Sequence, residues 1–559
     1  MSDHKEHPHI AKLKRQLAER SINRREFLRY STLLGVSATA AYQFADKIAG
    51  TEWVPQAHAA LPKGGTVRIA MRVPEIKHPH TFSWAYDSNV ARQVVEYLTR
   101  TGHDNVTRPY LLERWEASDD IKTWTLHVRK GVKWHNGRDF VAEDVAWNFN
   151  HALDAATGSS VLGLMKGYML EEYDTGEKDK DGNAKMSTRL WDANAIEVVD
   201  AHTVRLNLKE AQVAVPEHLF HYPFAILDPE ENGEFGAGSN GTGAFDLVDV
   251  RVGEKAVLKA RSDYWGDGPY LDGVEFIDLG DDPSAVVAAL ASGQVHGIYE
   301  GDVSQLDIFK NMPGVVIHPV TTAQTGVARV QVDRDEFKDP RIRKAMRLAV
   351  DTRRCLEIAH RDLGAAGEHH HVSPVHPDYK ELPFMERDVE AAKQLLAEAG
   401  KADGIDAEIA CKKDPAWELA AVQTLVEQWK EAGIRVKINV MPSAQFWEVW
   451  DKVPFGFTSW THRPLGFMVL GLAYRSNVPW NESNYANPEF DELLTQAEGT
   501  LDLEKRREII GRLEQIMQED GPMTQPLWRS VYSAYSEKVK GFRHHPTHYI
   551  FAEQIAIET

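Results

Sequence analysis

A strand–helix–strand pattern between residues 405 and 440 constrains the fold most strongly. Apolar side chains alternate from Ile405 to Cys411, recur at helical spacing from about Ala416 to Ala432, and alternate again from Ile434 to Val440. Two strands joined by a helix of this length are parallel, and the connection is right-handed. The pattern therefore predicts an α/β fold in which part of the sheet is parallel.

Other segments predict mixed sheets flanked by helices. Alternation indicates strands near residues 67–71, 124–128 and 204–208, and an apolar stripe predicts a helix that begins at Ser88 and continues to Leu98. Asp or Asn followed by Pro precedes three further stripes, at 282–283, 339–340 and 487–488, as is common at helix starts. These stripes are typical of core helices rather than of cofactor sites.

Composition and motifs exclude several function classes. The 559-residue chain has 64 Lys and Arg against 83 Asp and Glu, a formal net charge of −19, so we expect no nucleic-acid partner. Its two cysteines, Cys355 and Cys411, rule out a disulfide framework; they either form one pair in an oxidising compartment or remain separate buried thiols. Residues 236–241 match GxGxxG, but polar turns flank them instead of a strand and a helix. No motif indicates an enzyme.

The first 59 residues are organised like an export signal. Arg24-Arg25-Glu26-Phe27-Leu28 precedes a weakly apolar run, and Ala57-His58-Ala59 has the small-x-small pattern that a signal peptidase cleaves. This resembles a twin-arginine signal peptide with cleavage after Ala59; the alternative is an amphipathic N-terminal helix. No cysteine follows the cleavage point as a lipid attachment site. We therefore expect a free, soluble periplasmic protein that the twin-arginine translocase exports.

Histidine is frequent, with 24 in the chain, and His369, His370 and His371 are consecutive. Neighbouring Gly and Pro residues predict a loop here, since adjacent side chains of a strand or helix point to different sides. A solvated polar loop is one interpretation. The other is a loop that contacts a ligand or coordinates a metal ion, with His369, His371 and His462 as the candidate metal ligands.

Four segments between about residues 64 and 540 occur in the order and spacing of a known family. They are WTLHVRKGVKWHNGRDFVAEDV at 124–145, GTGAFDL at 241–247 with DYWG at 263–266, DPSAVVAALASGQV at 282–295, and DPRIRKA at 339–345 with AVD at 349–351. Together they resemble family 5 extracellular solute-binding proteins, the dipeptide-, oligopeptide- and nickel-binding components of ABC importers.

The resemblance implies a two-lobed clamshell, the periplasmic-binding-protein fold of the large cluster C type. Lobe I would comprise residues 60–324 and 529–559, and lobe II residues 325–528. The resemblance further implies a monomer without cofactor or catalysis, which captures a solute between its lobes and delivers it to the membrane permease subunits of an ABC importer. We expect the peptide or oligopeptide uptake class. The alternatives are a receptor for an anionic solute or a nickel-type metal chelate, and a periplasmic hydrolase on the same scaffold.

The resemblance also indicates residues of the cleft wall. They are His80 and Trp84 after the first strand, Gln324 at the hinge, and Trp460, His462 and Arg463 in lobe II. Peptide-binding members carry an Asp in the last segment that pairs with the peptide ammonium, whereas this chain has no Asp between Trp460 and Pro464. A guanidinium attracts a carboxylate or phosphate, so Arg463 favours a solute with an anionic group. The alternatives are an internal salt bridge for Arg463 and an ordinary core position for Trp460.

Overall fold

An 11-stranded mixed sheet runs through the centre of the protein in the computed structural model, which describes residues 6–49, 61–82, 85–178, 184–280 and 282–558. Its strand order is β10-β11-β12-β1-β13-β19-β14-β18-β16-β17, and β15 pairs with β19. The strands are β1 Thr66–Ala70, β10 Phe245–Arg251, β11 Lys255–Ala260, β12 Gly273–Ile277, β13 Gly297–Ile298, β14 Val315–Val330, β15 Gly364–Ala366, β16 Ile405–Lys412, β17 Ile434–Met441, β18 Phe455–Trp460 and β19 Met523–Ser536.

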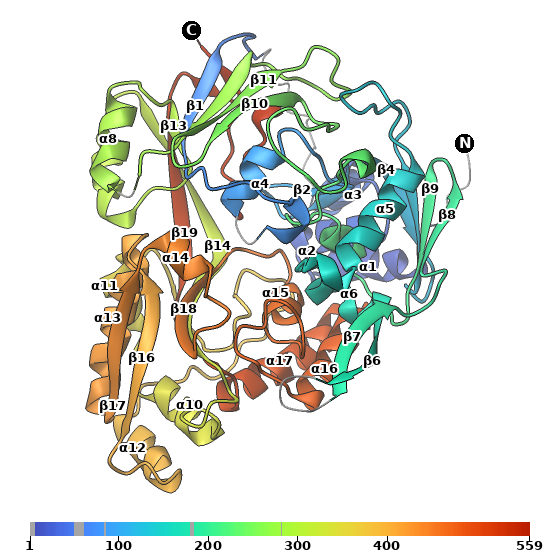
Figure 1. Ribbon diagram of the computed structural model, residues 1–559. Helices are drawn as coiled ribbons and strands as arrows, with labels where there is room; N and C mark the ends of the chain where they lie inside the picture. The colour runs from blue at the N-terminus through green and yellow to red at the C-terminus, as the bar shows by residue number, and fades with distance from the viewer. Residues whose placement is uncertain (1–5, 50–60, 83–84, 179–183, 281, 559) are drawn as a thin grey trace.

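Two long strands connect the halves of this sheet. β14 and β19 pair antiparallel from Val315 opposite Ser536 to Arg329 opposite Met523. At one end β19 pairs with β13, and at the other end β14 pairs with β18. Figure 1 shows the two strands passing from one body of the molecule into another. We call the body that contains β1 and β10 to β13 the upper body, and the one that contains β16 to β18 the lower body. This is the arrangement of a two-lobed α/β protein.

The predicted strand–helix–strand unit is confirmed in the lower body. β16 and β17 are parallel, with Ile405 opposite Ile434, and α13 Ala416–Glu431 connects them. Burial of one face explains the alternation, since Ile405, Ile409 and Ile434 are all buried. This body has its own core, which includes Trp429 and Phe457. Its other helices are α10 Pro340–Leu348, α11 Thr352–His360, α12 Val389–Glu398, α14 Ser443–Trp447, α15 Gly466–Ala473, α16 Pro488–Gly499 and α17 Leu503–Glu519.

The upper body adds smaller sheets to its part of the main sheet. A four-stranded antiparallel sheet has the order β4-β5-β9-β8, and α5 packs against it. The remaining elements are η1 Pro79–Thr81, α4 Ala85–Ala91, β2 Thr99–Thr101, β3 Thr107–Pro109, β4 Leu112–Ala117, β5 Thr123–Val128, α5 Ala142–Leu153, η2 Ala155–Thr157, α6 Val161–Met169, β6 Leu170–Lys178, β7 Ala184–Leu190, β8 Ile196–Asp200, β9 Thr203–Asn207, α7 Val215–His218, η3 Pro229–Glu231, α8 Pro283–Ala291, η4 Val303–Gln305, α9 Leu306–Lys310, β20 Val539–Lys540, η5 Ala552–Gln554 and β21 Ala556–Ile557.

The helix predicted from Ser88 to Leu98 is wrong in its bounds. α4 begins at Ala85 and ends at Ala91. Side chains of this segment bond to distant backbone: Asn89 Nδ2 donates to His548 O at 2.9 Å, and Gln93 Nε2 donates to Ile550 O at 2.9 Å. Val94 O accepts from Gly243 N at 2.8 Å. Tertiary hydrogen bonds thus replace the helical bonds that an apolar stripe would favour.

The N-terminal segment forms three helices, α1 Pro8–Ala18, α2 Arg24–Leu33 and α3 Ala38–Ala49, which pack against the upper body and also contact the lower one. Phe27 and Leu28 are buried, while Arg25 is exposed. Trp115 Nε1 donates to Leu33 O at 2.9 Å, and Arg29 donates to Asn105 O and Pro464 O. The predicted cleavage pattern at 57–59 lies outside the described residues.

Both cysteines, Cys355 and Cys411, are buried and free, as in the second of the two alternatives. Burial raises the pKa of each thiol to about 12, so neither is a reactive thiolate at neutral pH. Across the residues that the structure describes, we find no helix with the length and apolar character needed to cross a bilayer.

Candidate ligand-binding cleft

One candidate site is a chamber of about 330 Å³ at the carboxyl ends of parallel strands. Arg72 follows β1, Glu300 follows β13, and Asp414 follows β16. In open α/β sheets ligands bind outside these strand ends, because the loops there diverge and leave a crevice. We call this space the strand-end chamber.

The two bodies of the sheet meet across the strand-end chamber. Arg72 Nη2, from the upper body, lies 2.8 Å from Asp414 Oδ2 in the lower body. Both side chains are partly exposed, so this pair contributes about 0–1 kcal/mol. The pair therefore shows that the two bodies are in contact here, but it contributes little to holding them together.

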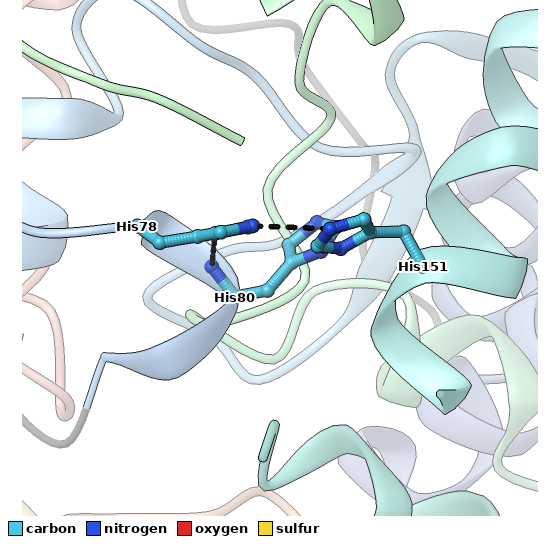
Figure 2. Close-up of side chains that lie close together, drawn as sticks. All are labelled: His78, His80 and His151. Atoms are coloured by element: carbon cyan, nitrogen blue, oxygen red, sulfur yellow. Dashed lines mark hydrogen bonds between the residues drawn. The ribbon is translucent and has the colours of Figure 1, made fainter. Parts of the chain in front are cut away.

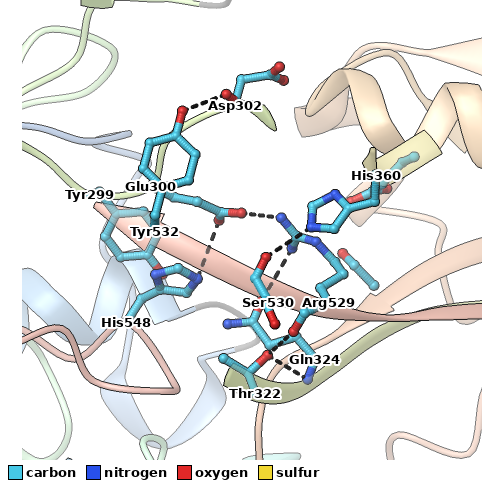
Figure 3. A network of polar contacts seen from close by, with 12 residues as sticks. Tyr299, Glu300, Asp302, Thr322, Gln324, His360, Arg529, Ser530, Tyr532 and His548 are labelled. Carbon is cyan, nitrogen blue, oxygen red and sulfur yellow. Dashed lines mark hydrogen bonds and ion pairs between the residues drawn. The ribbon is translucent and has the colours of Figure 1, made fainter. Parts of the chain in front are cut away.

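A buried polar network forms the floor of the strand-end chamber (Figure 3). The guanidinium of Arg529 pairs with the Glu300 carboxylate, and Arg529 Nη1 donates to Gln324 Oε1 at 3.2 Å. The same guanidinium lies 4.3 Å from the centre of the Trp417 ring, a cation–π contact. Arg529 is thus fixed by an anion, an amide and an aromatic face.

Two histidines beside Arg529 are neutral. Burial, and next the charge of Arg529, lower the pKa of both His548 and His360 to about 3. His548 Nε2 lies 3.4 Å from Glu300 Oε2, and His360 Nε2 is 3.0 Å from Ser530 O. Arg529 therefore carries the positive charge that opposes Glu300.

The strand-end chamber has an acidic excess. Its wall holds five acidic side chains, Asp278, Asp282, Glu300, Asp302 and Asp414, against three basic ones, Arg72, Lys413 and Arg529. Carboxylates that line a concave, partly dry space attract a cationic ligand, because the low-dielectric walls focus their field. This chamber is suited to the ammonium end of a solute.

A second, aromatic chamber of about 40 Å³ lies where β18 ends. Trp460 belongs to its wall, and its Nε1 donates to Glu482 Oε1 at 3.1 Å. The rings of Trp460 and Trp480 are 5.9 Å apart, centre to centre. The wall consists of Tyr222, Trp447, Trp450, Thr458, Ser459, Trp460, Thr461, Arg463 and Trp480.

Lys412 lies between the two chambers. It precedes Lys413 of the strand-end chamber, and its Nζ is 3.2 Å from Ser459 Oγ of the aromatic chamber. Lys412 Nζ also pairs with Glu418 Oε1 at 2.9 Å, with both side chains 1% exposed. A buried pair of this kind fixes the side chain, so the boundary between the chambers is rigid.

Arg463 is a buried charged residue in the wall of the aromatic chamber. Only 4% of it is exposed, and its guanidinium carbon lies 5.4 Å from the centre of the Tyr222 ring. Its Nη1 donates to Thr461 Oγ1 and to His462 O, whereas its Nε has no acceptor. Among the described residues no carboxylate lies within ion-pair distance of Arg463, so the internal salt bridge considered above is not seen. A buried cation without an anion is costly, and an anionic ligand group would offset that cost.

The other predicted cleft residues have different roles. His462 uses both ring nitrogens: Nδ1 accepts from Ala323 N at 3.0 Å, and Nε2 is 3.0 Å from Asn105 Oδ1. Gln324 belongs to the Arg529 network and donates to Pro546 O at 2.9 Å. His80 lies in a separate cluster with His78 and His151. Trp84 lies outside the described residues.

The consecutive histidines are buried rather than solvated. His369 Nδ1 accepts from Gln525 N at 3.0 Å, and His371 Nδ1 lies 2.8 Å from Tyr474 OH. None of His369, His370 and His371 belongs to the wall of either chamber. Within the described parts of the chain, His369, His371 and His462 do not form a group with converging ligand atoms, whereas His78, His80 and His151 do.

Sequence reasoning missed Arg72, Glu300, Asp414 and Arg529. A signal for the first three was present, because each is a charged residue within two positions of the end of an alternating or parallel strand. No local pattern identifies Arg529, which lies in the middle of β19. It faces the chamber only because β19 pairs with β14.

Comparisons with known proteins identify relatives of the whole chain. The profile of the family described as "Bacterial extracellular solute-binding proteins, family 5 Middle" matches residues 107–476, which is more than half of the chain. The periplasmic oligopeptide-binding protein OppA of Haemophilus influenzae is 25% identical over 84% of this chain and 88% of its own length.

Solved structures with different ligands share the fold. AgaA of A.tumefacien R10 in complex with agropinic acid has a TM-score of 0.78 at 21% identity, covering 89% of this chain and 99% of that one. NikZ of Campylobacter jejuni in complex with Ni(L-His) has a TM-score of 0.73 at 21% identity, covering 88% of this chain and 99% of that one. The two-lobed fold predicted from sequence is thereby confirmed. The chain belongs to the family 5 extracellular solute-binding proteins.

Proposed function

We propose that this protein is the solute receptor of an ABC importer of the peptide uptake class, and that its solute carries both an ammonium and an anionic group. The observation that supports this most directly is the buried Arg463, which has no carboxylate partner among the described residues. The acidic excess of the strand-end chamber supplies the complementary site for an ammonium. A short peptide with free ends has both charges. The oligopeptide-binding protein of Haemophilus influenzae, and relatives named as dipeptide-binding proteins, support this class.

We assign residues 60–324 and 529–559 to lobe I and residues 325–528 to lobe II. β14 and β19, which pair along most of their length, would then serve as the hinge. Contacts between the proposed lobes reach beyond the chambers: Lys166 Nζ donates to Ser476 O at 2.9 Å, and Val213 N donates to Glu498 O at 3.0 Å. Contacts of this kind between the proposed lobes are expected of a closed conformation.

In such a receptor the ligand acts by differential binding. A solute favours closure only through contacts that it makes with both lobes at once, and a shift from mostly open to mostly closed needs about 5.5 kcal/mol of preference. An ammonium among the carboxylates at the strand ends and an anionic group at Arg463 would contribute to that preference. The permease subunits would recognise the closed form, and no catalytic step is required.

We further propose that residues 1–59 are a twin-arginine signal, so that the periplasmic, monomeric protein begins at Ala60. The order of the arginine pair, apolar run and small-x-small pattern supports this. In the uncleaved chain, the packed helices α1 to α3 bury Phe27 and Leu28 of the motif while Arg25 stays exposed. Mass spectrometry of protein from the periplasm tests the proposal, since an intact N-terminus there would contradict cleavage.

The solute itself is best identified by native mass spectrometry of protein purified from its own periplasm, because slowly dissociating ligands copurify. We expect a bound mass that tandem fragmentation assigns to a short peptide. Calorimetry with that peptide and with its C-terminally amidated form then tests whether the anionic group is recognised. The amidated peptide should bind at least tenfold more weakly than the peptide with a free carboxylate. A solute that has no amine would instead support the anionic-solute alternative, which Arg463 also favours. A bound mass that disappears with chelator would support the metal-chelate alternative.

A further inference from the structure

A compact group of three imidazoles lies in lobe I, outside both chambers (Figure 2). His78 is the N-cap of the short η1 turn, His80 is the middle residue of that turn, and His151 lies in the last turn of α5. His78 Nε2 is 3.4 Å from His151 Nε2, and His80 Nδ1 is 3.1 Å from His151 Nδ1. One ligand atom from each ring lies within 4.8 Å of those of the other two.

The surroundings of His80 and His151 fix their rings. His80 Nε2 lies 2.9 Å from the carbonyl oxygen of Ala225, which only an N–H can bond, so the lone pair of His80 is on Nδ1, toward His151. This is the arrangement that orients histidines in metal sites, where the distal nitrogen donates to a carbonyl or carboxylate. The His151 ring is stacked between Trp147 and His78, with ring centres 4.7 Å away on each side.

We propose that His78, His80 and His151 bind one divalent transition-metal ion of the Zn²⁺ class. Imidazole nitrogens are ligands for Zn²⁺, Ni²⁺ and Cu²⁺. With Zn–N bonds of about 2.0–2.1 Å, tetrahedral geometry separates the ligand nitrogens by about 3.3 Å. The Nε2 atoms of His78 and His151, 3.4 Å apart, already have this separation. Because these two rings are stacked with 26° between their planes, the His78 ring has to turn before its in-plane lone pair converges with those of the other two histidines. Three protein ligands leave the fourth position to water or another small ligand.

Metal binding requires one local change in the cluster. His78 needs one adjustment: its Nδ1 accepts from His80 N at 3.1 Å, so coordination through Nε2 exchanges that hydrogen bond for the metal. His78 and His151 are only partly buried, which gives the ion a route from solvent.

A metal here would brace the wall of the strand-end chamber. The η1 turn leads into α4, which contains Tyr86, a residue of that wall. Linking the turn to α5 would fix the start of this segment, in the way that a ligand bound only to the native state stabilises it. The site would therefore act on chamber geometry without contacting the solute.

Zinc titration of the full chain, stripped with chelator and free of solute, tests this proposal. We expect one tight equivalent of Zn²⁺ and a raised melting temperature. We also expect Co²⁺ to give the visible absorption typical of a tetrahedral site. His151→Gln and His80→Gln should each weaken Zn²⁺ binding more than about 100-fold, since loss of an outer partner alone costs 10–100-fold.

The control is His202→Gln, which removes a half-buried histidine from the turn between β8 and β9 and should leave the zinc equivalent unchanged. A His151→Cys variant supplies a substitute ligand, so it should restore the Zn²⁺ binding that His151→Gln loses, whereas a loss caused by misfolding alone would not be restored. The proposal is overturned if the wild-type chain takes up no tight Zn²⁺, or if His151→Gln and His80→Gln retain it. Solute affinity plays no part in these measurements, so the result is independent of the proposed function.

Discussion

The Arg463→Met variant should bind the natural solute more weakly without becoming less stable. A charge-assisted hydrogen bond to a ligand contributes about 1.5–3 kcal/mol, which corresponds to an affinity about 10- to 150-fold weaker when it is lost. Because no carboxylate of the described residues pairs with Arg463, the ligand would be the main partner of this charge.

Stability should respond differently. The substitution removes the Nη1 hydrogen bonds to Thr461 and His462, each worth about 0.5–1.5 kcal/mol, and the contact with Tyr222. It also removes the penalty of burying an unpaired guanidinium, which is several kcal/mol. Met has a similar length and fills most of the space. The free energy of unfolding of the ligand-free protein should therefore stay within about 1 kcal/mol of wild type or rise.

Isothermal titration calorimetry with the copurified solute measures the affinity, and urea unfolding of ligand-free protein measures the stability. Arg435→Met is the matched control, since Arg435 lies in the edge strand β17, outside both chambers, and forms an exposed pair with Asp406 at 2.7 Å. A solute derivative without its anionic group should bind wild type and Arg463→Met equally. Unchanged affinity together with reduced stability would refute the reasoning and make Arg463 a structural residue.

Three further predictions concern the rest of the chain. Glu482→Gln should lower the free energy of unfolding by about 3–5 kcal/mol, because it leaves Arg329, 2.6 Å away and fully buried, without its carboxylate. Urea unfolding measures this loss, and a loss below about 1 kcal/mol would contradict the prediction. Burial raises the pKa of Glu514 from 4.5 to about 9, so its contribution to stability is full below pH 4.5 and is lost as the pH rises towards 9, by up to about 1.4 kcal/mol per pH unit. The free energy of unfolding should differ less between pH 5 and pH 8 for Glu514→Gln than for wild type. Equal differences would exclude this assignment. Replacing Arg24 and Arg25 together by Lys should keep the protein out of the periplasm, as fractionation and immunoblotting would show, whereas normal export would remove the twin-arginine interpretation.

Local sequence patterns correctly predicted the helices and strands that bury one face. The strands β16 and β17 and the helix between them follow from alternation and from an apolar stripe, because one face of each element packs against the core of the lower body. The helix expected from Ser88 failed, since Asn89 and Gln93 bond to the backbone of residues 548 and 550. No local pattern contains information about partners that are more than 450 positions away.

The candidate site shows the same division. The resemblance to family 5 identified Trp460 and Arg463, which do belong to the aromatic chamber. The sequence also suggested the histidines at 369–371, which the structure places in the core, outside the walls of both chambers. Their burial could not be foreseen from a segment rich in Gly and Pro, because a loop becomes buried only when other parts of the chain cover it.

The sequence by itself determined the α/β class and the two-lobed family fold, because periodicity and ordered motifs are properties of the chain. Only the tertiary structure decided which charges share a chamber. Glu300 and Arg529 are more than 200 residues apart, and they meet because β13 and β19 pair. His78 and His151 likewise meet only through packing of the η1 turn near α5. Electrostatic and coordinating sites depend on distances of a few ångströms, and the folded arrangement of distant segments sets those distances.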